Sequence, residues 1–254
     1  MQMQGNTIFI TGSTSGIGRA LAEAFHKLGN KVIVSGRRQA LIDEIVAANP
    51  GMAGIALDIT DPASIQAAAK QLLAEHPDVN VLINNAGIMP FDDPGAPIAD
   101  ELVDRIYTTN FLGPIRMTSA LIEHLKTKPY AAILNNTSVL AYVPIATNGV
   151  YSALKAALHA YTLSQRFQLR DTKVQVQEIA PPWVDTDLIH KSGDPRAMPL
   201  DVFIAETMSK LGGDAPEVFV DAIQMLRDNP GSGEHAFFDA FNQSLVENPI
   251  PVGV

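Results

Sequence analysis

Short runs of β-branched residues alternate with longer segments of helical periodicity along most of the chain. This alternation is typical of parallel strands joined by crossover helices, because each helix must cross a face of the sheet before the next strand can pair. Six strands are expected, over Thr7–Ile10, Lys31–Val34, Gly54–Leu57, Val79–Ile83, Ala131–Asn135 and Val174–Ile179. The pattern predicts an α/β fold in three layers, with a doubly wound parallel sheet between two layers of helices.

The segments between the predicted strands carry signals for where helices begin and end. The first has one apolar face, formed by Ile17, Leu21, Ala24, Phe25 and Leu28. Gly29 follows this face in the position of a helix C-cap. Asp61 and Pro62 predict the start of another helix, as its N-cap and its first helical residue. Further helices are expected near 98–126 and 149–171.

Composition limits the class of protein. The 254 residues suit a single domain over 1–254, and a content of 46% hydrophobic and 18% charged residues argues against a disordered chain. The net charge of −9 argues against a nucleic-acid partner. The absence of cysteine excludes disulfides and thiolate chemistry and fits a reducing compartment. No stretch approaches the ~18 apolar residues of a membrane span. We therefore expect a cytoplasmic protein with no membrane partner.

The stretch TGSTSGIG, residues 11–18, joins the first predicted strand to the first predicted helix. Glycines let the backbone turn tightly beside a pyrophosphate, and the helix N-terminus offers free N–H donors to it. The spacing Gly-x-x-x-Gly-x-Gly differs from the commoner Gly-x-Gly-x-x-Gly, and an ordinary strand-to-helix turn is the alternative. The nucleotide contacts predicted here are Gly12, Ser13, Ser15, Gly16, Ile17 and Gly18.

The end of the second predicted strand lacks an acidic residue. A site for NAD usually places Asp or Glu there, on the 2′-hydroxyl of the ribose. Arg37 and Arg38 stand there instead, and a guanidinium pairs well with a 2′-phosphate. This predicts NADP(H) in preference to NAD(H). The alternative is that both arginines form the solvated start of a helix.

Five features follow one another along the chain: TGSTSGIG, NNAG at 84–87, Asn110, Ser138, and Tyr151-x-x-x-Lys155. In these features and their order the sequence resembles the classical short-chain dehydrogenase/reductase family. These matches cover roughly residues 5 to 190. The resemblance implies a Rossmann fold and an NADP(H)-dependent oxidoreductase that interconverts a carbonyl and a secondary alcohol.

Tyr151 and Lys155 are four residues apart, which places them on one face of a helix. A nearby ammonium favours the phenolate, so we expect Lys155 to lower the pKa of Tyr151, the general acid and base. The resemblance has Lys155 bind the nicotinamide ribose, Ser138 bond the substrate oxygen, and Asn110 support a water linked to Lys155. Thr137 competes with Ser138, but adjacent strand residues face opposite sides. Purely structural roles are the alternative for each residue.

The resemblance implies further nucleotide contacts, at Asp58, Ile59, Asn85, Ala86, Gly87, Pro181, Val184 and Thr186. Asp58 would hold the adenine amino group and Thr186 the nicotinamide carboxamide. A purely structural role for the NNAG motif is the alternative. Pro182 stands where the family carries glycine. Because proline fixes φ and has no N–H, we expect the backbone path beside the nicotinamide to differ.

The segment after the sixth predicted strand is broken by prolines and glycine, which predicts a substrate lid over 182–212. Residues 229–254 are expected to form an atypical tail without a strand. Phe237, Phe238 and Phe241 suggest a short helix or a packed tail there. This tail puts the family's tetramer contact in doubt, so a homodimer and a homotetramer both stay open.

The substrate is expected to be a mainly hydrophobic small ketone or alcohol, because apolar residues stand in the loops that would line the cleft. These candidates are Met89, Pro90, Leu140, Tyr142, Val143, Trp183, Ile189 and Met198. Simple packing of the lid is the alternative reading of these residues. Arg196 and Lys191 could meet an anionic substrate, but solvated charges are the simpler interpretation.

Other functions stay open beside the carbonyl–alcohol reaction. The same fold can support reduction of a carbon–carbon double bond or a lyase or epimerase reaction, and a protein that only senses NADP(H) is a different class. Retention of Tyr151 and Lys155 favours an enzyme. The six histidines include no pair at metal-ligand spacing, so no metal is expected. Residues 135–164 also resemble a bacterial subgroup of oxidoreductases associated with lipoteichoic-acid D-alanylation, a label that names no substrate.

Overall fold

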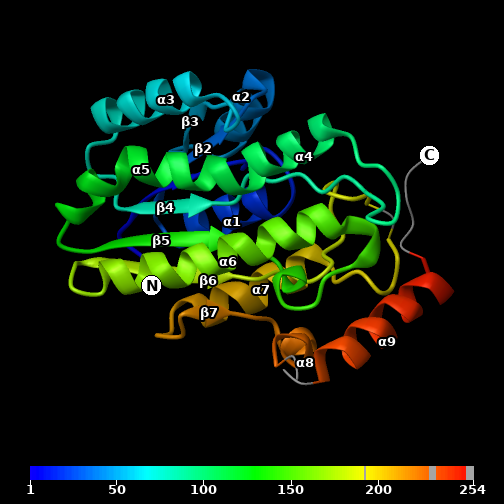
Figure 1. The fold of residues 1–254 in the computed structure, drawn as a ribbon. Coiled ribbons are helices and arrows are strands. Elements are labelled where there is room, and N and C mark those ends of the chain that lie inside the picture. The colour runs from blue at the N-terminus through cyan, green and yellow to red at the C-terminus, as the bar shows by residue number, and fades with distance from the viewer. Residues whose placement is uncertain (192, 229–232, 250–254) are drawn as a thin grey trace.

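A seven-stranded parallel sheet forms the centre of the computed structural model, which describes residues 1–191, 193–228 and 233–249 (Figure 1). The strand order is β3-β2-β1-β4-β5-β6-β7. The strands are β1 (Thr7–Ile10), β2 (Lys31–Gly36), β3 (Ala53–Ala56), β4 (Val81–Asn84), β5 (Ala131–Asn136), β6 (Val174–Ile179) and β7 (Glu217–Val218). This is the Rossmann-like, doubly wound arrangement that the sequence predicts.

The strands are buried on both faces because their side chains alternate between two apolar cores. In β1, Ile8 and Ile10 belong to one core and Phe9 to the other. Phe9 pairs with Ile33 of β2 and Leu82 of β4, and all three lie in the same core. A parallel sheet covered on both sides needs such near-continuous apolar strands.

Helices cover both faces of this sheet (Figure 1). On one face lie α1 (Gly16–Lys27), α2 (Gln39–Ala48) and α7 (Leu200–Leu211). On the other lie α3 (Pro62–Glu75), α5 (Gly113–Lys126) and α6 (Gly149–Leu169). The remaining helices are α4 (Asp100–Tyr107), α8 (Gln224–Arg227) and α9 (Glu234–Glu247). No helix in the described part of the chain is long and apolar enough to cross a bilayer.

Local signals in the sequence place several helix ends correctly. Asp61 caps α3, because its Oδ1 accepts a hydrogen bond of 2.9 Å from the backbone N–H of Ala63, and Pro62 is the first helical residue. Gly29 follows α1 with φ of 84°, a left-handed conformation that favours glycine. These ends depend on a few neighbouring residues, so the chain alone specifies them.

Three elements differ from the expectation. The helix predicted over 98–126 is divided by a π-helical turn, Thr108–Leu112, between α4 and α5. The predicted lid contains α7, whose buried Phe203, Ile204 and Leu211 pack into the core beside α1. A seventh strand, β7, pairs with β6 ahead of the predicted tail. Within 233–249 the tail forms a helix, α9, and no strand. Residue 192 of the predicted lid, and residues 229–232 and 250–254 of the tail, lie outside the described residues.

Candidate active site

A cleft of about 1630 Å³ opens at the carboxyl ends of the strands. In the strand order, β1 and β4 are neighbours although two strands and three helices separate them in the chain. The connections from these two strands leave in opposite directions, and doubly wound sheets bind ligands in the crevice that results. Nearly all predicted site residues line this cleft: Gly12, Ser15, Gly16, Ile17, Gly18, Arg37, Arg38, Asp58, Ile59, Asn85, Ala86, Gly87, Ser138, Tyr151, Lys155, Pro181, Val184 and Thr186.

The glycine-rich turn has the backbone shape that a dinucleotide needs. Gly12 and Gly16 have φ of 64° and 53°, in the left-handed region. A Cβ on Gly18 would lie 2.3 Å from Asn85 Nδ2 and 2.5 Å from the carbonyl oxygen of Gly12. The N-cap of α1, Ser15, makes no side-chain capping bond, so the first N–H groups of the helix are available to a pyrophosphate. The turn therefore fits the pyrophosphate of a nicotinamide dinucleotide.

One predicted contact in this turn stands back from the cleft. Ser13 is fully buried, and its Oγ donates a hydrogen bond of 2.8 Å to the carbonyl oxygen of Ile10. The same Oγ accepts a 2.8 Å bond from the backbone N–H of Ser35. Ser13 thus ties the turn to β1 and β2, whereas its neighbour Thr14 lines the cleft. A serine followed by threonine gives no signal in the sequence of which hydroxyl turns inward.

Arg37 and Asp58 approach each other where the adenosine end of a nucleotide would lie. Burial raises the pKa of Asp58, but hydrogen bonds from Thr60 and the charge of Arg37 outweigh it, so this pKa lies below its usual value. Asp58 Oδ1 accepts from the Thr60 backbone N–H at 2.9 Å and from its Oγ1 at 2.7 Å. Arg37 and Arg38 are both exposed, and Arg38 is the N-cap of α2. Two exposed cations therefore stand at the rim of the cleft, where a phosphate can reach them from solvent.

The NNAG motif joins the turn to the centre of the sheet. Asn85 Nδ2 donates to the carbonyl oxygens of Thr11, at 3.1 Å, and Gly12, at 3.0 Å. Asn136, at the end of β5, donates from its Nδ2 to Asn85 Oδ1 at 2.8 Å. The motif thus bonds the turn to the end of β5, and its residues Asn85, Ala86 and Gly87 also line the cleft.

Ser138 and Tyr151 lie together at the base of the cleft. The Tyr151 ring is buried, and the Ser138 hydroxyl lies beside it at the same wall of the cleft. Burial raises the pKa of Tyr151 well above its ordinary value, and the nearby Ser138 hydroxyl opposes this rise only in part. Thr137 also lines the cleft, but its Oγ1 donates a 2.5 Å hydrogen bond to Oε1 of the buried Glu178.

Lys155 has one backbone partner in the buried base of the site. Its Nζ donates a 2.8 Å bond to the carbonyl oxygen of Asn136, a cleft residue that the sequence analysis did not single out. Burial lowers the pKa of Lys155 to about 8, and the charge of Glu178 opposes this. The ammonium lies 5.5 Å from the centroid of the Tyr151 ring. The expected lowering of the Tyr151 pKa by Lys155 is not what the structure gives, because loss of water around the phenol dominates.

Asn110 does not reach the cleft wall. It lies in the π-helical turn, where its Oδ1 accepts from the Ile88 backbone N–H at 2.9 Å and its Nδ2 donates to the Ile88 carbonyl at 2.8 Å. Both polar atoms of its amide therefore hold the segment that follows NNAG. π-Helical turns are frequent at functional sites, and here the extra residue turns Asn110 toward Ile88.

The comparisons with known proteins agree with this geometry. The family model described as short chain dehydrogenase matches residues 6–197. The chain belongs to the short-chain dehydrogenase/reductase family. It is 36% identical over 248 residues to the uncharacterized oxidoreductase DltE of Bacillus subtilis, covering 95% of this chain and 98% of that protein. It is 36% identical over 195 residues to serine 3-dehydrogenase of Agrobacterium fabrum, covering 75% and 78%.

A solved structure extends the likeness to the whole fold. A short-chain dehydrogenase from Burkholderia cenocepacia, solved in complex with NADP, superposes with a TM-score of 0.80 at 26% identity. The match covers 99% of this chain and 100% of that one. The chain is thus an oxidoreductase of this family.

The half of this dehydrogenase's cleft away from the nucleotide turn is apolar and built from distant segments. Six of the eight predicted wall residues line it, namely Met89, Pro90, Leu140, Trp183, Ile189 and Met198. Val143 is buried behind the wall, and the Tyr142 hydroxyl lies near His159 and Glu178. Arg196 lines the cleft but Lys191 does not.

Helix α9 closes this half of the cleft, a role that the sequence did not reveal. Phe241 and Leu245 of α9 line the cavity. Asn242 fixes the helix, because its Nδ2 donates to the Pro144 carbonyl at 3.1 Å and its Oδ1 accepts from the Ala146 N–H at 2.5 Å. Arg196 ties the far end of α9 to the segment after β6, through the carbonyl oxygens of Asn248 and Pro249.

Proposed function

We propose that this protein is an NADP(H)-dependent dehydrogenase/reductase that interconverts a carbonyl and a secondary alcohol on a mainly hydrophobic small molecule. The observation that carries the proposal is that Ser138, the buried Tyr151 and Lys155 line one cavity, with the Lys155 ammonium 5.5 Å from the centroid of the Tyr151 ring. When bound, the nicotinamide supplies or accepts the hydride. The chain's own residues handle the proton and the position of the substrate oxygen.

Tyr151 acts as the general acid in reduction and the general base in oxidation. Its raised pKa keeps the phenol protonated at neutral pH, so it holds the proton that a developing alkoxide needs. Ser138 donates a second hydrogen bond to the same substrate oxygen. Lys155 binds the nicotinamide ribose, and its ammonium offsets negative charge on Tyr151 when the proton leaves. Asn110 acts indirectly, as a positioning residue for the segment at Ile88.

The cofactor preference rests on the charges at the rim of the cleft. Arg37 and Arg38 stand where a 2′-phosphate would lie, and no acidic residue ends β2. A phosphate would meet the guanidinium of Arg37 beside Asp58, which the same charge already stabilises. NADP(H) is therefore preferred over NAD(H).

In the described part of the chain, the lid of this site consists of residues 182–191 and 193–199, since α7 belongs to the core. Trp183 and Asp185 bond the backbone of Met198, at 2.8 Å and 3.0 Å, which folds the segment back over the cleft. With α9 it covers the apolar half. Such covers exclude water from the reacting atoms and limit the site to apolar substrates of matching size.

Calorimetric titration with NADPH and NADH in parallel tests the cofactor, followed by NADPH oxidation with a panel of ketones of increasing apolar chain length. NADPH is expected to bind at least 10-fold tighter than NADH, because a guanidinium–phosphate pair contributes ~1.5–3 kcal/mol. Apolar ketones are expected to support turnover and charged ones to fail. Binding of neither nucleotide would contradict the assignment of the whole cleft, and turnover of only carbon–carbon double bonds would contradict the reaction.

The same proposal includes a homodimer or homotetramer located in the cytoplasm. Light scattering during size-exclusion chromatography measures the assembly, and a monomer would contradict it. Fractionation of the source cells measures the location.

A further inference from the structure

A buried carboxylate, Glu178, lies directly behind the catalytic groups. It is in β6, its side chain is fully buried, and it does not line the cleft. An isolated carboxylate inside a protein costs several kcal/mol, so such a group persists only where it is paired and hydrogen-bonded. The proposed reaction, as described so far, gives Glu178 no part.

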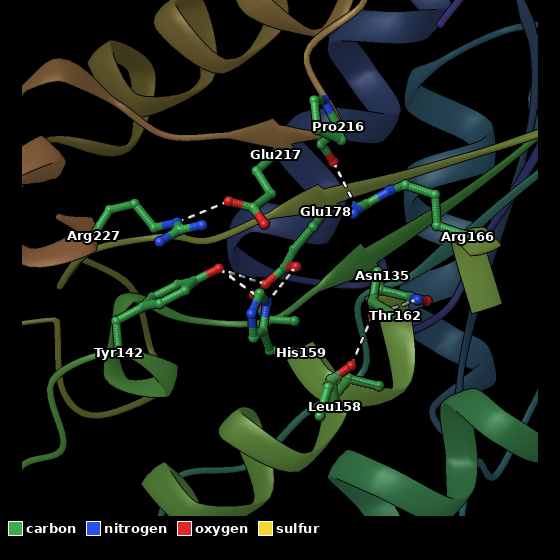
Figure 2. Close-up of polar contacts among 12 residues, drawn as sticks. Asn135, Tyr142, Leu158, His159, Thr162, Arg166, Glu178, Pro216, Glu217 and Arg227 are labelled. Carbon is green, nitrogen blue, oxygen red and sulfur yellow. Dashed lines mark hydrogen bonds and ion pairs between the residues drawn. The ribbon is translucent and has the colours of Figure 1, made fainter. Parts of the chain in front are cut away.

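The oxygen atoms of Glu178 hold both ends of the turn that carries Ser138. Oε1 accepts a 2.5 Å bond from Thr137 Oγ1 and a 3.2 Å bond from the Tyr142 hydroxyl (Figure 2 shows the second). Thr137 precedes Ser138, and Tyr142 ends the 3-10 turn Val139–Ala141 that Ser138 caps. One carboxylate oxygen therefore fixes the backbone on either side of the Ser138 hydroxyl.

The second oxygen of Glu178 reaches the helix that carries Tyr151 and Lys155. Oε2 lies 2.8 Å from Nδ1 of His159 (Figure 2). Tyr151, Lys155 and His159 are spaced by four residues on α6, so they share one face of the helix. The charge of Glu178 also raises the pKa of Lys155, against the effect of burial. The carboxylate thus contacts the Ser138 turn through one oxygen and helix α6 through the other. Its charge also acts on Lys155 of the same helix.

Further charged groups lie close to Glu178 and to its partner Tyr142. Arg227 of α8 donates from Nε to Glu217 Oε2 at 2.8 Å, and its guanidinium lies 4.7 Å from the centroid of the Tyr142 ring. The titratable and charged groups that face Glu178 are Lys155, His159, Tyr142, Glu217 and Arg227. Arg227 pairs with Glu217 and also feels the charge of Glu178, while Lys155 is the buried cation on which the charge of Glu178 acts.

The same residues include a potential set of metal ligands. His159, Glu178 and Glu217 each place one ligand atom within 4.8 Å of the others. Yet Glu178 accepts bonds from hydroxyl donors, and Glu217 is paired with Arg227 (Figure 2). A metal would have to displace these donors, so the geometry favours a hydrogen-bonded network over a metal site.

We propose that Glu178 is a positioning residue for the reaction: through Thr137 and Tyr142 it holds the Ser138 hydroxyl in place, and through His159 it holds the face of α6 that carries Tyr151 and Lys155. This inference rests on the proposed roles of Ser138 and Lys155. It predicts that the carboxylate contributes to turnover while leaving nucleotide binding alone, since it touches neither the glycine turn nor Arg37.

Glu178→Gln tests this, because it keeps the shape of the side chain and removes its charge. We expect kcat to fall about 10-fold or more, with the NADPH dissociation constant within about twofold of wild type. Without the carboxylate the ammonium is less stable, so the alkaline limb of the kcat profile moves to lower pH. NMR titration of nucleotide-free, [13C]lysine-labelled protein gives a readout independent of activity; the Lys155 signal, identified by its loss in Lys155→Met, is expected to titrate at lower pH.

Two further variants separate the effect of the hydrogen bonds of Glu178 from the effect of its charge. Tyr142→Phe keeps the carboxylate but removes one donor, and it is expected to lower kcat without moving the Lys155 titration. Glu217→Gln is the matched control, since it removes a carboxylate of the same cluster that is paired with Arg227. It is expected to leave kcat and the pH profile within about twofold of wild type.

The outcomes separate this inference from the proposed function. A wild-type protein without NADPH-dependent turnover would contradict the proposed function, while the NMR titration would still test the link between Glu178 and Lys155. Wild-type kcat and titration in Glu178→Gln, or equal effects in Glu217→Gln, would overturn the inference. Loss of activity in chelator that zinc restores would overturn it in favour of a metal site. If Glu178→Gln does not fold, unchanged kcat in both Thr137→Val and Tyr142→Phe overturns it.

Discussion

The two halves of the cleft are built by different means. In the nucleotide half, glycines let the backbone pass close to its neighbours. A Cβ on Gly12 would lie 2.6 Å from Ala86 Cα, and one on Gly36 would lie 2.8 Å from Thr14 Cγ2. The substrate half consists of side chains from loops and helices far apart in sequence, such as Leu140, Trp183 and Phe241 in its wall. The first half depends on backbone shape and the second on apolar surface.

This difference has consequences for what each half can tolerate. A glycine with positive φ, or one without room for a Cβ, admits almost no substitution, because strain or a clash follows whatever side chain is added. An apolar wall tolerates exchanges of similar volume at a cost below ~1.5 kcal/mol. The nucleotide half is therefore expected to admit few substitutions, whereas the side chains of the substrate half can be exchanged. Substitutions at the boundary and in each half test this contrast.

Tyr151→Phe, at the boundary of the halves, has the largest expected effect. Losing the hydroxyl removes the proposed proton donor, so turnover is expected to fall about 10³-fold or more, as for loss of a general acid. The NADPH dissociation constant stays within about twofold, because the nucleotide turn is untouched. Steady-state kinetics and calorimetry measure the two quantities.

The control is Tyr161→Phe, on the same helix but outside the cleft wall, where the ring packs edge-on against Phe111. It is expected to keep wild-type turnover. An undiminished rate in Tyr151→Phe would remove this hydroxyl from the reaction and would move the proton-transfer step to a different group.

Arg37→Asp has the next largest effect and acts on the nucleotide half alone. It replaces the cation that faces a 2′-phosphate with a carboxylate beside Asp58, so phosphate is repelled and a ribose hydroxyl gains an acceptor. The ratio of NADPH to NADH affinity is expected to fall about 100-fold. NADPH loses affinity and NADH gains it, each by about 10-fold, which corresponds to ~1.4 kcal/mol for each change.

Arg196→Asp makes the same charge change in the other half of the cleft, where Arg196 pairs with Asp194 and lies over Trp183. Its nucleotide ratio is expected to match wild type. Equal shifts in both variants would show that only the net charge of the protein matters, which would contradict a specific 2′-phosphate site.

The sequence could predict the features that depend on local backbone shape, but not those that depend on contacts between distant side chains. The strands β1 and β6, the cap at Asp61 and the glycine turn were predicted because each depends on neighbouring residues or on a fixed spacing. The side-chain orientation of Ser13 and the partners of Asn110 depend on contacts 20 or more residues away. Such contacts leave no periodic pattern in the sequence.

Some elements that were missed did leave a signal. The apolar residues of α7 that are buried, including Phe203, Ile204 and Leu211, stand at helical spacing within a segment interpreted only through its prolines. Glu178 is a charged residue inside the predicted strand Val174–Ile179, where a lone carboxylate is costly and so needs partners. By contrast, β7 has two residues, too few for any period to show.

Phe241→Ala changes only the substrate half of the cleft and has the smallest expected effect. Truncating this ring opens the wall that α9 provides, and burial of a Phe side chain contributes ~1.5–3 kcal/mol, so KM for long apolar ketones is expected to rise about 10-fold. Phe238→Ala is the matched control, on the same helix but outside the cleft wall. The NADPH dissociation constant and the KM for the smallest ketone stay near wild type in both variants, because neither ligand reaches α9. A rise in KM that is equal for long and short ketones would show that α9 supports the fold of the site as a whole, whereas a rise confined to the long ones would make Phe241 a determinant of substrate length.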